Sequence, residues 1–282
     1  MIDQEWYTTA ADVKMPCLIY GTAWKKERTT DLVVKAITAG FRGIDTACQP
    51  KHYAEPLVGD AVHRLNEQGI KRESLFLQTK FTPLNGQDPT QIPYDKFAPL
   101  AVQVAQSFAV SQKNLRTQYV DSLVLHSPLE SHGLLMEAWR AMEVIYQAGG
   151  ARQLGISNCY SLATLTQLYS DAMVKPAVVQ NRFYDKTGYD VDLRDWCKKQ
   201  GVIYQSFWTL TANPDITASE VIKSLARKNG KTVAQVFFRY LTQVGIAPLT
   251  GTCSAQHMQE DLEIFSFKLS SDEITQISRL LD

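Results

Sequence analysis

The feature that most constrains the fold of this chain is the alternation of short apolar segments with longer segments whose apolar residues recur at helical spacing. There are eight apolar segments, and no glycine- or serine-rich linker interrupts the series. Such alternation predicts a parallel sheet, and eight repeats predict that it closes into one (β/α)8 TIM barrel. We expect the strands at residues 17–21, 41–45, 75–80, 120–126, 152–157, 177–180, 202–207 and 245–249.

The segments between and after these strands predict helices. A first helix ends at Gly40, and we expect others at residues 55–68, 100–115, 134–147, 162–169, 192–199, 218–228, 233–243, 254–265 and 271–281. Since a barrel of this kind needs about 250 residues, the 282 residues predict one domain over 1–282. The alternative fold is a doubly wound open sheet. The nucleotide-binding patterns G-x-G-x-x-G and G-x-x-x-x-G-K-[ST], which often accompany that fold, are absent from the sequence.

Two stretches fall outside the repeat. Residues 1–16 are polar and predict an irregular N-terminal extension. Residues 81–99 contain four prolines and one glycine, which predicts a long loop. Because loops of this length are usually functional, we expect residues 81–99 to form a lid or a pocket wall over the barrel mouth.

Charge and cysteine content narrow the classes of function. Lysine plus arginine equals aspartate plus glutamate, 29 against 29, so no bulk charge favours nucleic acid or an anionic membrane. Five scattered cysteines form no C-x-x-C pair, which favours a reducing compartment over a disulfide framework or a zinc site. No apolar run approaches the ~20 residues of a membrane span, and no signal peptide is apparent. We therefore expect a soluble, cytoplasmic protein.

Ionisable side chains terminate several of the predicted strands. Asp45, Lys80 and His126 each end an apolar segment, and Tyr53 follows Asp45 by eight residues. In a barrel, the carboxyl ends of the strands carry the active site. A tyrosine has a pKa near 10, which a neighbouring ammonium is expected to lower while a carboxylate orients the ammonium. These residues predict a proton donor for a developing alkoxide, with His126 hydrogen-bonded to a carbonyl oxygen.

The other strand ends carry hydrogen-bonding and aromatic residues instead of nucleophiles. Ser157, Asn158 and Gln180 are suited to bind a carboxamide, and Phe207 is suited to stack on a flat ring. Because no side chain donates a hydride, the reaction that fits is hydride addition to a carbonyl from a nicotinamide cofactor.

With these residues in place, the chain resembles the aldo-keto reductase family over nearly its whole length. The resemblance rests on segments in the same order along the chain: GTAW at 21–24, GIDTA at 43–47, HYAE at 52–55, FLQTK at 76–80, DSLVLHSP at 121–128, LGISN at 154–158, VVQ at 178–180 and PLTGT at 248–252. It implies a (β/α)8 barrel and NADPH-dependent reduction of aldehydes and ketones. It also implies a catalytic tetrad of Asp45, Tyr53, Lys80 and His126, with Tyr53 as the acid.

The resemblance further implies a cofactor site and a substrate pocket. The carboxamide ligands are Ser157, Asn158 and Gln180, and Phe207 stands where the family usually has a stacking tyrosine. The remaining cofactor contacts are expected at Thr22, Trp208, Thr209, Leu210, Thr250, Gly251, Thr252, Ser254 and His257. Trp24 lies close to the family's pocket tryptophan, and it is expected to line the substrate pocket with His52.

Three departures from the family pattern affect these expectations. Tyr53 follows Asp45 by eight residues instead of five, so we expect an insertion within residues 48–51. No lysine or arginine lies between Leu249 and Phe265, where relatives hold the 2′-phosphate, which weakens the case for NADPH. The resemblance still favours NADPH, with NADH as the alternative, and a helix start at Thr252, Ser254 and His257 is suited to bind phosphate. The chain ends soon after its last helix, so the substrate pocket is expected to be open, which suits a bulky or aromatic carbonyl.

Rival functions remain at this point. A class I aldolase would use Lys80 as its nucleophile, but that leaves Phe207 and the Ser157-Asn158 pair without a role. A metal-dependent hydrolase needs clustered histidines, and the five histidines form no H-x-H or H-E-x-x-H motif. A cofactor-binding regulatory or redox-sensing subunit with little turnover is the main alternative. The expected partner is a small carbonyl substrate, with no metal, and a monomer is expected in preference to an oligomer.

Overall fold

Eight parallel strands close into a barrel at the centre of the molecule, which confirms the predicted fold class. The computed structural model describes residues 5–281. The strands follow the order β10-β3-β4-β5-β6-β7-β8-β9 around the barrel, and β9 pairs with β10 to close it. They are β3 (Ile19–Gly21), β4 (Gly43–Asp45), β5 (Phe76–Phe81), β6 (Ser122–Leu125), β7 (Leu154–Ser157), β8 (Val178–Arg182), β9 (Ile203–Phe207) and β10 (Ile246–Thr250).

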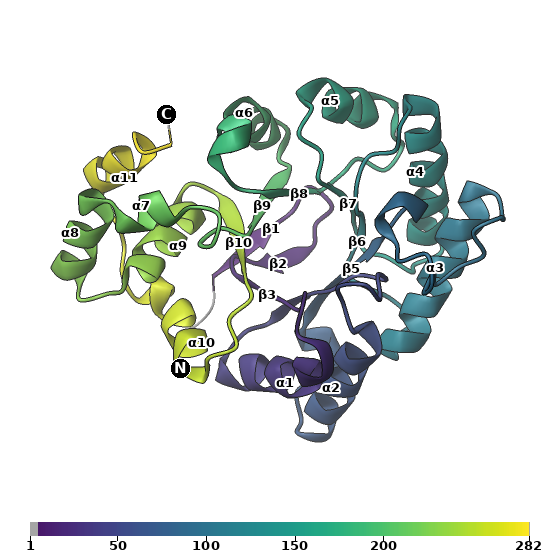
Figure 1. The fold of residues 1–282 in the computed structure, drawn as a ribbon, viewed down its shortest axis with the longest axis horizontal. Coiled ribbons are helices and arrows are strands. Elements are labelled where there is room, and N and C mark those ends of the chain that lie inside the picture. The colour runs from purple at the N-terminus through teal and green to yellow at the C-terminus, as the bar shows by residue number, and fades with distance from the viewer. Residues whose placement is uncertain (1–4, 282) are drawn as a thin grey trace.

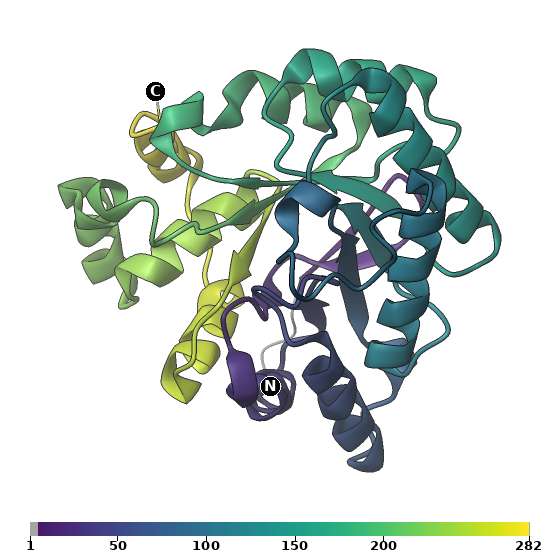
Figure 2. The ribbon, with the colours of Figure 1, turned by 45° about the vertical axis from the view of Figure 1, so that its right-hand side comes forward.

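Helices surround the strands on the outside (Figures 1 and 2). The N-terminal caps of several helices are hydroxyl side chains that accept from the backbone of the first turn, as at Ser131, Ser161 and Ser254. Of the described residues, no helix is long and apolar enough to cross a membrane. The helices are α1 (Thr29–Ala39), α2 (Glu55–Glu67), α3 (Leu100–Leu115), α4 (His132–Gln147), α5 (Leu162–Asp171), α6 (Val191–Gln200), α7 (Pro214–Ala218), α8 (Glu220–Asn229), α9 (Val233–Gln243), α10 (Ala255–Leu262) and α11 (Ser271–Ser278).

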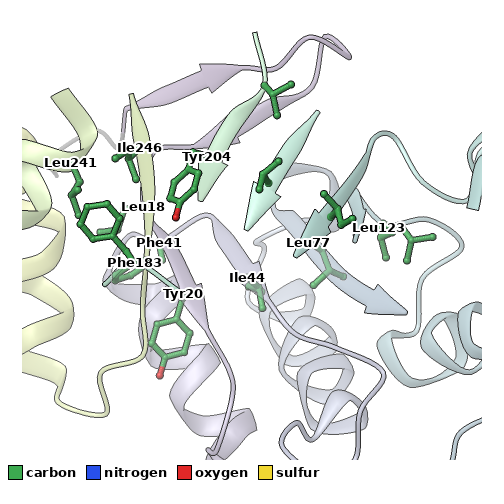
Figure 3. Close-up of a cluster of buried hydrophobic side chains, with 14 of the residues drawn as sticks. Leu18, Tyr20, Phe41, Ile44, Leu77, Leu123, Phe183, Tyr204, Leu241 and Ile246 are labelled. Atoms are coloured by element: carbon green, nitrogen blue, oxygen red, sulfur yellow. The ribbon is translucent and has the colours of Figure 1, made fainter. Parts of the chain in front are cut away.

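The side chains of each barrel strand alternate between the helices and the barrel interior. The outward side chains join the large core between strands and helices, which includes Ile44, Leu77 and Leu123 (Figure 3). The inward side chains at the amino ends of the strands form a second apolar cluster, which includes Phe76 and Val178. Because this cluster fills the amino end of the barrel, the polar inward residues gather at the carboxyl end.

The N-terminal segment is not irregular, contrary to the sequence expectation. Within the expected extension 1–16, β1 (Trp6–Thr8) and β2 (Lys14–Pro16) pair as an antiparallel hairpin, and residues 1–4 lie outside the described residues. Figure 1 shows this hairpin within the ring of helices. Met15 is fully buried in the interior cluster, and its Sδ accepts from Gln205 Nε2 at 3.1 Å. The hairpin therefore closes the amino end of the barrel.

Candidate active site

A buried ion pair occupies the carboxyl end of the barrel interior. Lys80 on β5 is 1% exposed and Asp45 at the end of β4 is 2% exposed. The Lys80 Nζ donates to both carboxylate oxygens of Asp45 at 2.7 Å and to the Thr46 carbonyl at 2.9 Å. All three donor directions of the ammonium are used, so the charge of Lys80 is held in one place.

Three glutamines, Gln78, Gln180 and Gln205, form a hydrogen-bonded layer next to this ion pair. Gln78 Nε2 and Gln180 Nε2 donate to Asp45 Oδ1 at 2.8 and 3.0 Å, and both also donate to Gln205 Oε1. A carboxylate buried in a barrel is costly unless it is paired and hydrogen-bonded. The glutamine layer supplies those bonds and fixes the orientation of Asp45.

The loop after β4 brings Tyr53 to the ion pair in spite of the longer spacing from Asp45. The amides of His52 and Tyr53 both donate to the Gln49 carbonyl, at 3.1 and 3.0 Å, which closes a tight turn. This turn takes up the additional residues. The Tyr53 ring lies 5.2 Å from Lys80 Nζ and 6.0 Å from the His126 ring, measured to the ring centroids. Tyr53 therefore lies against Lys80 and His126, and Lys80 in turn is bonded to Asp45, so the four predicted tetrad residues lie together.

The pKa of Tyr53 differs from the sequence expectation. Burial raises the pKa of Tyr53, and the nearby Asp45 carboxylate raises it further. Burial and Asp45 outweigh the lowering that was expected from Lys80, whose ammonium donates to Asp45. The Tyr53 hydroxyl has no hydrogen-bond partner among residues 5–281. Tyr53 therefore presents a protonated phenol at neutral pH whose proton is not shared with the protein.

His126 is held as a neutral imidazole beside this phenol. Burial lowers the pKa of His126 well below its usual value, and the Lys80 and His52 charges lower it further. The Nδ1 of His126 lies 2.7 Å from Thr82 Oγ1. Among residues 5–281, this is the only acceptor within reach of the Thr82 hydroxyl proton, so we infer that Thr82 donates and Nδ1 accepts. In that tautomer Nε2 carries the proton and is available to donate.

Replacing Thr82 with valine should lower kcat/KM for an aldehyde by about 3- to 10-fold, the effect of one hydrogen bond. Valine keeps the shape of the side chain but frees His126 to adopt the tautomer that has no proton on Nε2. Steady-state kinetics checks this, with Thr82→Ser as the matched control that keeps the hydroxyl. Equal losses in the valine and serine variants would show that the hydroxyl has no part in positioning His126.

The segment 81–99 packs against the same loop. It contains a short 3-10 helix at Leu84–Gly86, and Gln87 Nε2 donates to the Cys48 carbonyl at 3.0 Å. Gln49 Nε2 donates in turn to the Gly86 carbonyl at 2.6 Å, and the Tyr94 hydroxyl donates to the Thr82 carbonyl at 2.8 Å. These bonds tie the segment to the loop that carries Tyr53, so the two form one wall beside the tetrad.

The predicted carboxamide ligands lie together on β7 and β8, with part of their hydrogen-bonding capacity already in use. Ser157 Oγ donates to the Gln180 carbonyl at 2.7 Å, and Asn158 Nδ2 donates to the His126 carbonyl at 2.8 Å. Both amide protons of Gln180 are taken by Asp45 and Gln205. Gln180 Oε1 accepts no bond from residues 5–281, so it is an acceptor suited to the N–H groups of a carboxamide.

The residues after β9 separate into two groups. Phe207 packs against the interior cluster and is only partly buried, and Trp208 is 50% exposed with a left-handed backbone, φ 56°. These two rings are available for stacking, and Leu210 is partly buried beside them in sequence. Thr209 is buried, and its hydroxyl bonds Ser206 Oγ at 2.9 Å. The Thr209 hydroxyl is thus engaged within the protein, and a cofactor contact at Thr209 remains a prediction.

The predicted phosphate-binding residues after β10 also differ in availability. Thr250 Oγ1 donates to the buried Asp261 at 2.7 Å, and Thr22 Oγ1 donates to the Asp45 carbonyl at 2.9 Å. The protons of both hydroxyls are therefore already donated to acceptors within the protein. Gly251 and His257 are exposed, Thr252 and Ser254 are partly buried, and Ser254 caps α10. These four residues remain candidates for a phosphate at the N-terminus of α10.

Sequence reasoning missed Lys25, which supplies a cation to this region. Its Nζ donates to the Gly251 carbonyl and lies 3.5 Å from Cys253 Sγ. A Cβ added at Gly251 would lie 3.5 Å from that ammonium, an ordinary van der Waals contact. Lys25 follows Trp24 directly in the sequence, and its place after the first barrel strand was the available signal. The donor set of Lys25, exposed backbone and a helix N-terminus fits phosphate oxygens.

The predicted pocket residues Trp24 and His52 pack against each other, with their ring planes tilted by 38°. Their ring centroids are 4.0 Å apart, and the Trp24 amide donates to the His52 carbonyl at 2.7 Å. Trp24 is 58% exposed and has a left-handed backbone, φ 63°. A large apolar surface held in a strained conformation at the mouth is suited to contact a ligand.

Comparisons with known proteins agree with this geometry. Residues 18–282 match the model of the Aldo/keto reductase family. Glyoxal reductase of Bacillus subtilis is 30% identical over 252 residues, which cover 89% of this chain and 83% of the relative. The NADPH-dependent alpha-keto amide reductase of Saccharomyces cerevisiae is 29% identical over 302 residues, which cover 98% and 91%. The crystal structure of an aldo/keto reductase from Brucella melitensis superposes with a TM-score of 0.83 at 27% identity, over 99% of this chain and 100% of that one.

Proposed function

Because the chain belongs to the aldo/keto reductase family, we propose that it reduces aldehydes or ketones to alcohols with a nicotinamide cofactor. The observation that carries the proposal is the convergence of Tyr53, His126 and the Lys80–Asp45 pair beside an open amide acceptor, Gln180 Oε1. The printed names of its relatives support the reaction class, since they include glyoxal, keto amide and codeinone reductases.

Each residue of the tetrad has a distinct role in the proposed carbonyl reduction. The nicotinamide supplies the hydride that adds to the carbonyl carbon. Tyr53 gives its phenolic proton to the carbonyl oxygen as negative charge develops there. His126 donates from Nε2 to the same oxygen and orients the carbonyl, while the Lys80 ammonium stabilises the phenolate that Tyr53 leaves behind. Asp45 holds the ammonium in place.

We propose NADPH as the preferred cofactor. Two of the similar proteins are named as NADPH-dependent reductases, the yeast keto amide reductase and a codeinone reductase of Papaver somniferum. In this chain, Lys25 provides the cation that the segment from Leu249 to Phe265 lacks, and Ser254 with the start of α10 provides donors. Ser157, Asn158 and Gln180 would hold the carboxamide, with Phe207 against the ring.

The proposal is tested by following cofactor oxidation at 340 nm with a panel of aromatic aldehydes and ketones. We expect turnover with NADPH and a higher KM for NADH. Fluorescence titration of both cofactors measures binding separately from turnover. Tight NADPH binding with no turnover on any carbonyl would favour the alternative of a cofactor-binding regulatory subunit. Binding of neither cofactor would contradict both functions.

A further inference from the structure

Among the described residues, an arginine without an acidic partner lies at the end of β8, opposite the strand that ends in Asp45. Strand β8 extends two residues beyond Gln180, to Arg182. Because side chains alternate along a strand, Arg182 lies on the same side as Gln180, which faces the barrel interior and donates to Asp45. In the parallel register Arg182 pairs with Phe207, whose ring packs on the interior cluster. Arg182 therefore belongs to the uppermost inward layer of the barrel.

The guanidinium is fixed in orientation by aromatic rings. Its Cζ lies 4.3 Å from the centroid of a Trp208 ring and 5.4 Å from that of Tyr184. The backbone amide of Arg182 donates to the Tyr160 hydroxyl at 3.2 Å. The half-exposed Trp208 keeps its place through a left-handed backbone conformation, which is costly for a bulky residue and is typical of functional sites. Arg182 is thus oriented, partly buried and open to the mouth.

In the described part of the chain, no acidic side chain is paired with this guanidinium. Among residues 5–281, it forms no ion pair and donates no hydrogen bond. The acidic side chains that follow it in the chain are engaged elsewhere: Asp190 accepts from Asn181 and Tyr204, each at 2.8 Å, and Asp185 accepts from the Lys186 amide. Five N–H donors in a planar arrangement therefore remain for a ligand, and carboxylates match that arrangement.

The position of Arg182 favours a substrate group over the cofactor phosphates. In the barrel, β8 lies opposite β4, with three strands between them on either side. Lys25 and the start of α10 lie at β3 and β10, and β9 with Trp208 separates them from Arg182. A ligand that reaches from Tyr53, which follows β4, to Arg182 crosses the mouth, which is roughly 15 Å wide for eight tilted strands. The carboxylate and the reacting carbonyl are then several bonds apart.

We propose that Arg182 is a carboxylate-binding residue and that the substrate is an oxo acid with its carboxylate remote from the carbonyl. This rests on the proposed carbonyl reduction and specifies its substrate class. A 4-formylbenzoate has such a separation, and its methyl ester is a neutral molecule of similar shape.

The test compares these two aldehydes in the wild type, Arg182→Met and Arg140→Met. Methionine keeps much of the apolar stem beside Trp208, and Arg140 is an exposed residue of α4 that controls for the loss of one positive charge. We expect the wild type to prefer 4-formylbenzoate. In Arg182→Met, kcat/KM should fall 10- to 100-fold for the acid and less than 2-fold for the ester, with Arg140→Met unchanged.

Each contrary outcome has a distinct meaning. Equal losses for acid and ester overturn the subsite, as does a wild type without preference for the acid. A weaker NADPH affinity in Arg182→Met, measured by fluorescence titration, assigns the arginine to the cofactor phosphates and also overturns the proposal. If the wild type reduces neither aldehyde, the proposed carbonyl reduction is contradicted, and this result leaves the Arg182 subsite undecided. Calorimetric titration with terephthalate, which has no carbonyl to reduce, then decides the subsite: binding lost only in Arg182→Met supports it, and equal binding in all three proteins contradicts it.

Discussion

Replacing Tyr53 with phenylalanine is expected to lower kcat/KM by about 10²- to 10⁴-fold, the range found for general acids. Phenylalanine keeps the ring that lies 5.2 Å from Lys80 Nζ and 6.0 Å from the His126 ring, and removes only the hydroxyl. Because that hydroxyl bonds no other residue between 5 and 281, its removal should leave the fold and the NADPH affinity unchanged. Steady-state kinetics with fluorescence titration of NADPH measures both quantities.

The pH dependence gives a second readout of the same acid. Burial and Asp45 raise the pKa of Tyr53, so its proton remains bound through the neutral range. The pKa of His126 lies well below its usual value, so this residue is neutral in that range. We therefore expect a flat profile of kcat/KM from about pH 6.5 to 9.

A Tyr53→Phe variant that keeps the wild-type rate would contradict the role of Tyr53 as the acid. His52 would then be the next candidate, because the Tyr20 hydroxyl already donates to the Thr252 carbonyl.

Replacing Lys80 with methionine is expected to reduce the free energy of unfolding by about 3–5 kcal/mol. The substitution leaves the carboxylate of Asp45, 2% exposed, without its counter-ion, and the bonds from Gln78 and Gln180 do not neutralise it. Urea unfolding measures the loss. The exposed pair Arg64–Asp31 provides a matched control, since Arg64→Met should cost less than about 1 kcal/mol.

The double variant Lys80→Met with Asp45→Asn separates charge from packing. Removing both charges leaves no uncompensated ion in the barrel, so the double variant should regain most of the lost stability while remaining inactive. A double variant as unstable as Lys80→Met alone would assign the loss to packing of the lysine stem. If Lys80→Met were as stable as the wild type, the inference that Lys80 compensates the buried charge of Asp45 would be contradicted.

The barrel could be predicted because parallel strands buried on both faces are continuous apolar runs, and eight of them are visible in the sequence. Individual contacts could not be predicted in the same way. The hairpin β1–β2 was missed because its two strands are only three residues long. Arg182 was missed because the predicted strand ends at Gln180, two residues before the structural end of β8.

Residue type alone also did not determine how charges act within the site. An ammonium close to a phenol was expected to lower the pKa of Tyr53, yet burial and the Asp45 carboxylate raise it. Here Lys80 is committed to Asp45 and Thr46, and burial has the larger effect on the tyrosine. Similarly, threonines at strand ends were expected to face a cofactor, but whether a hydroxyl points outward or into the fold depends on its tertiary partners, such as Asp261 for Thr250.

The closed amino end of the barrel has a kinetic consequence. Because Met15 and the hairpin fill that end in the described part of the chain, we expect ligands to enter and leave at the carboxyl end, beside the tetrad. In the proposed binding mode, a nicotinamide ring against Gln180 and Phe207 would lie deeper than a carbonyl compound placed over it. We therefore expect the cofactor to add before the carbonyl compound, and the alcohol to leave before the oxidised cofactor.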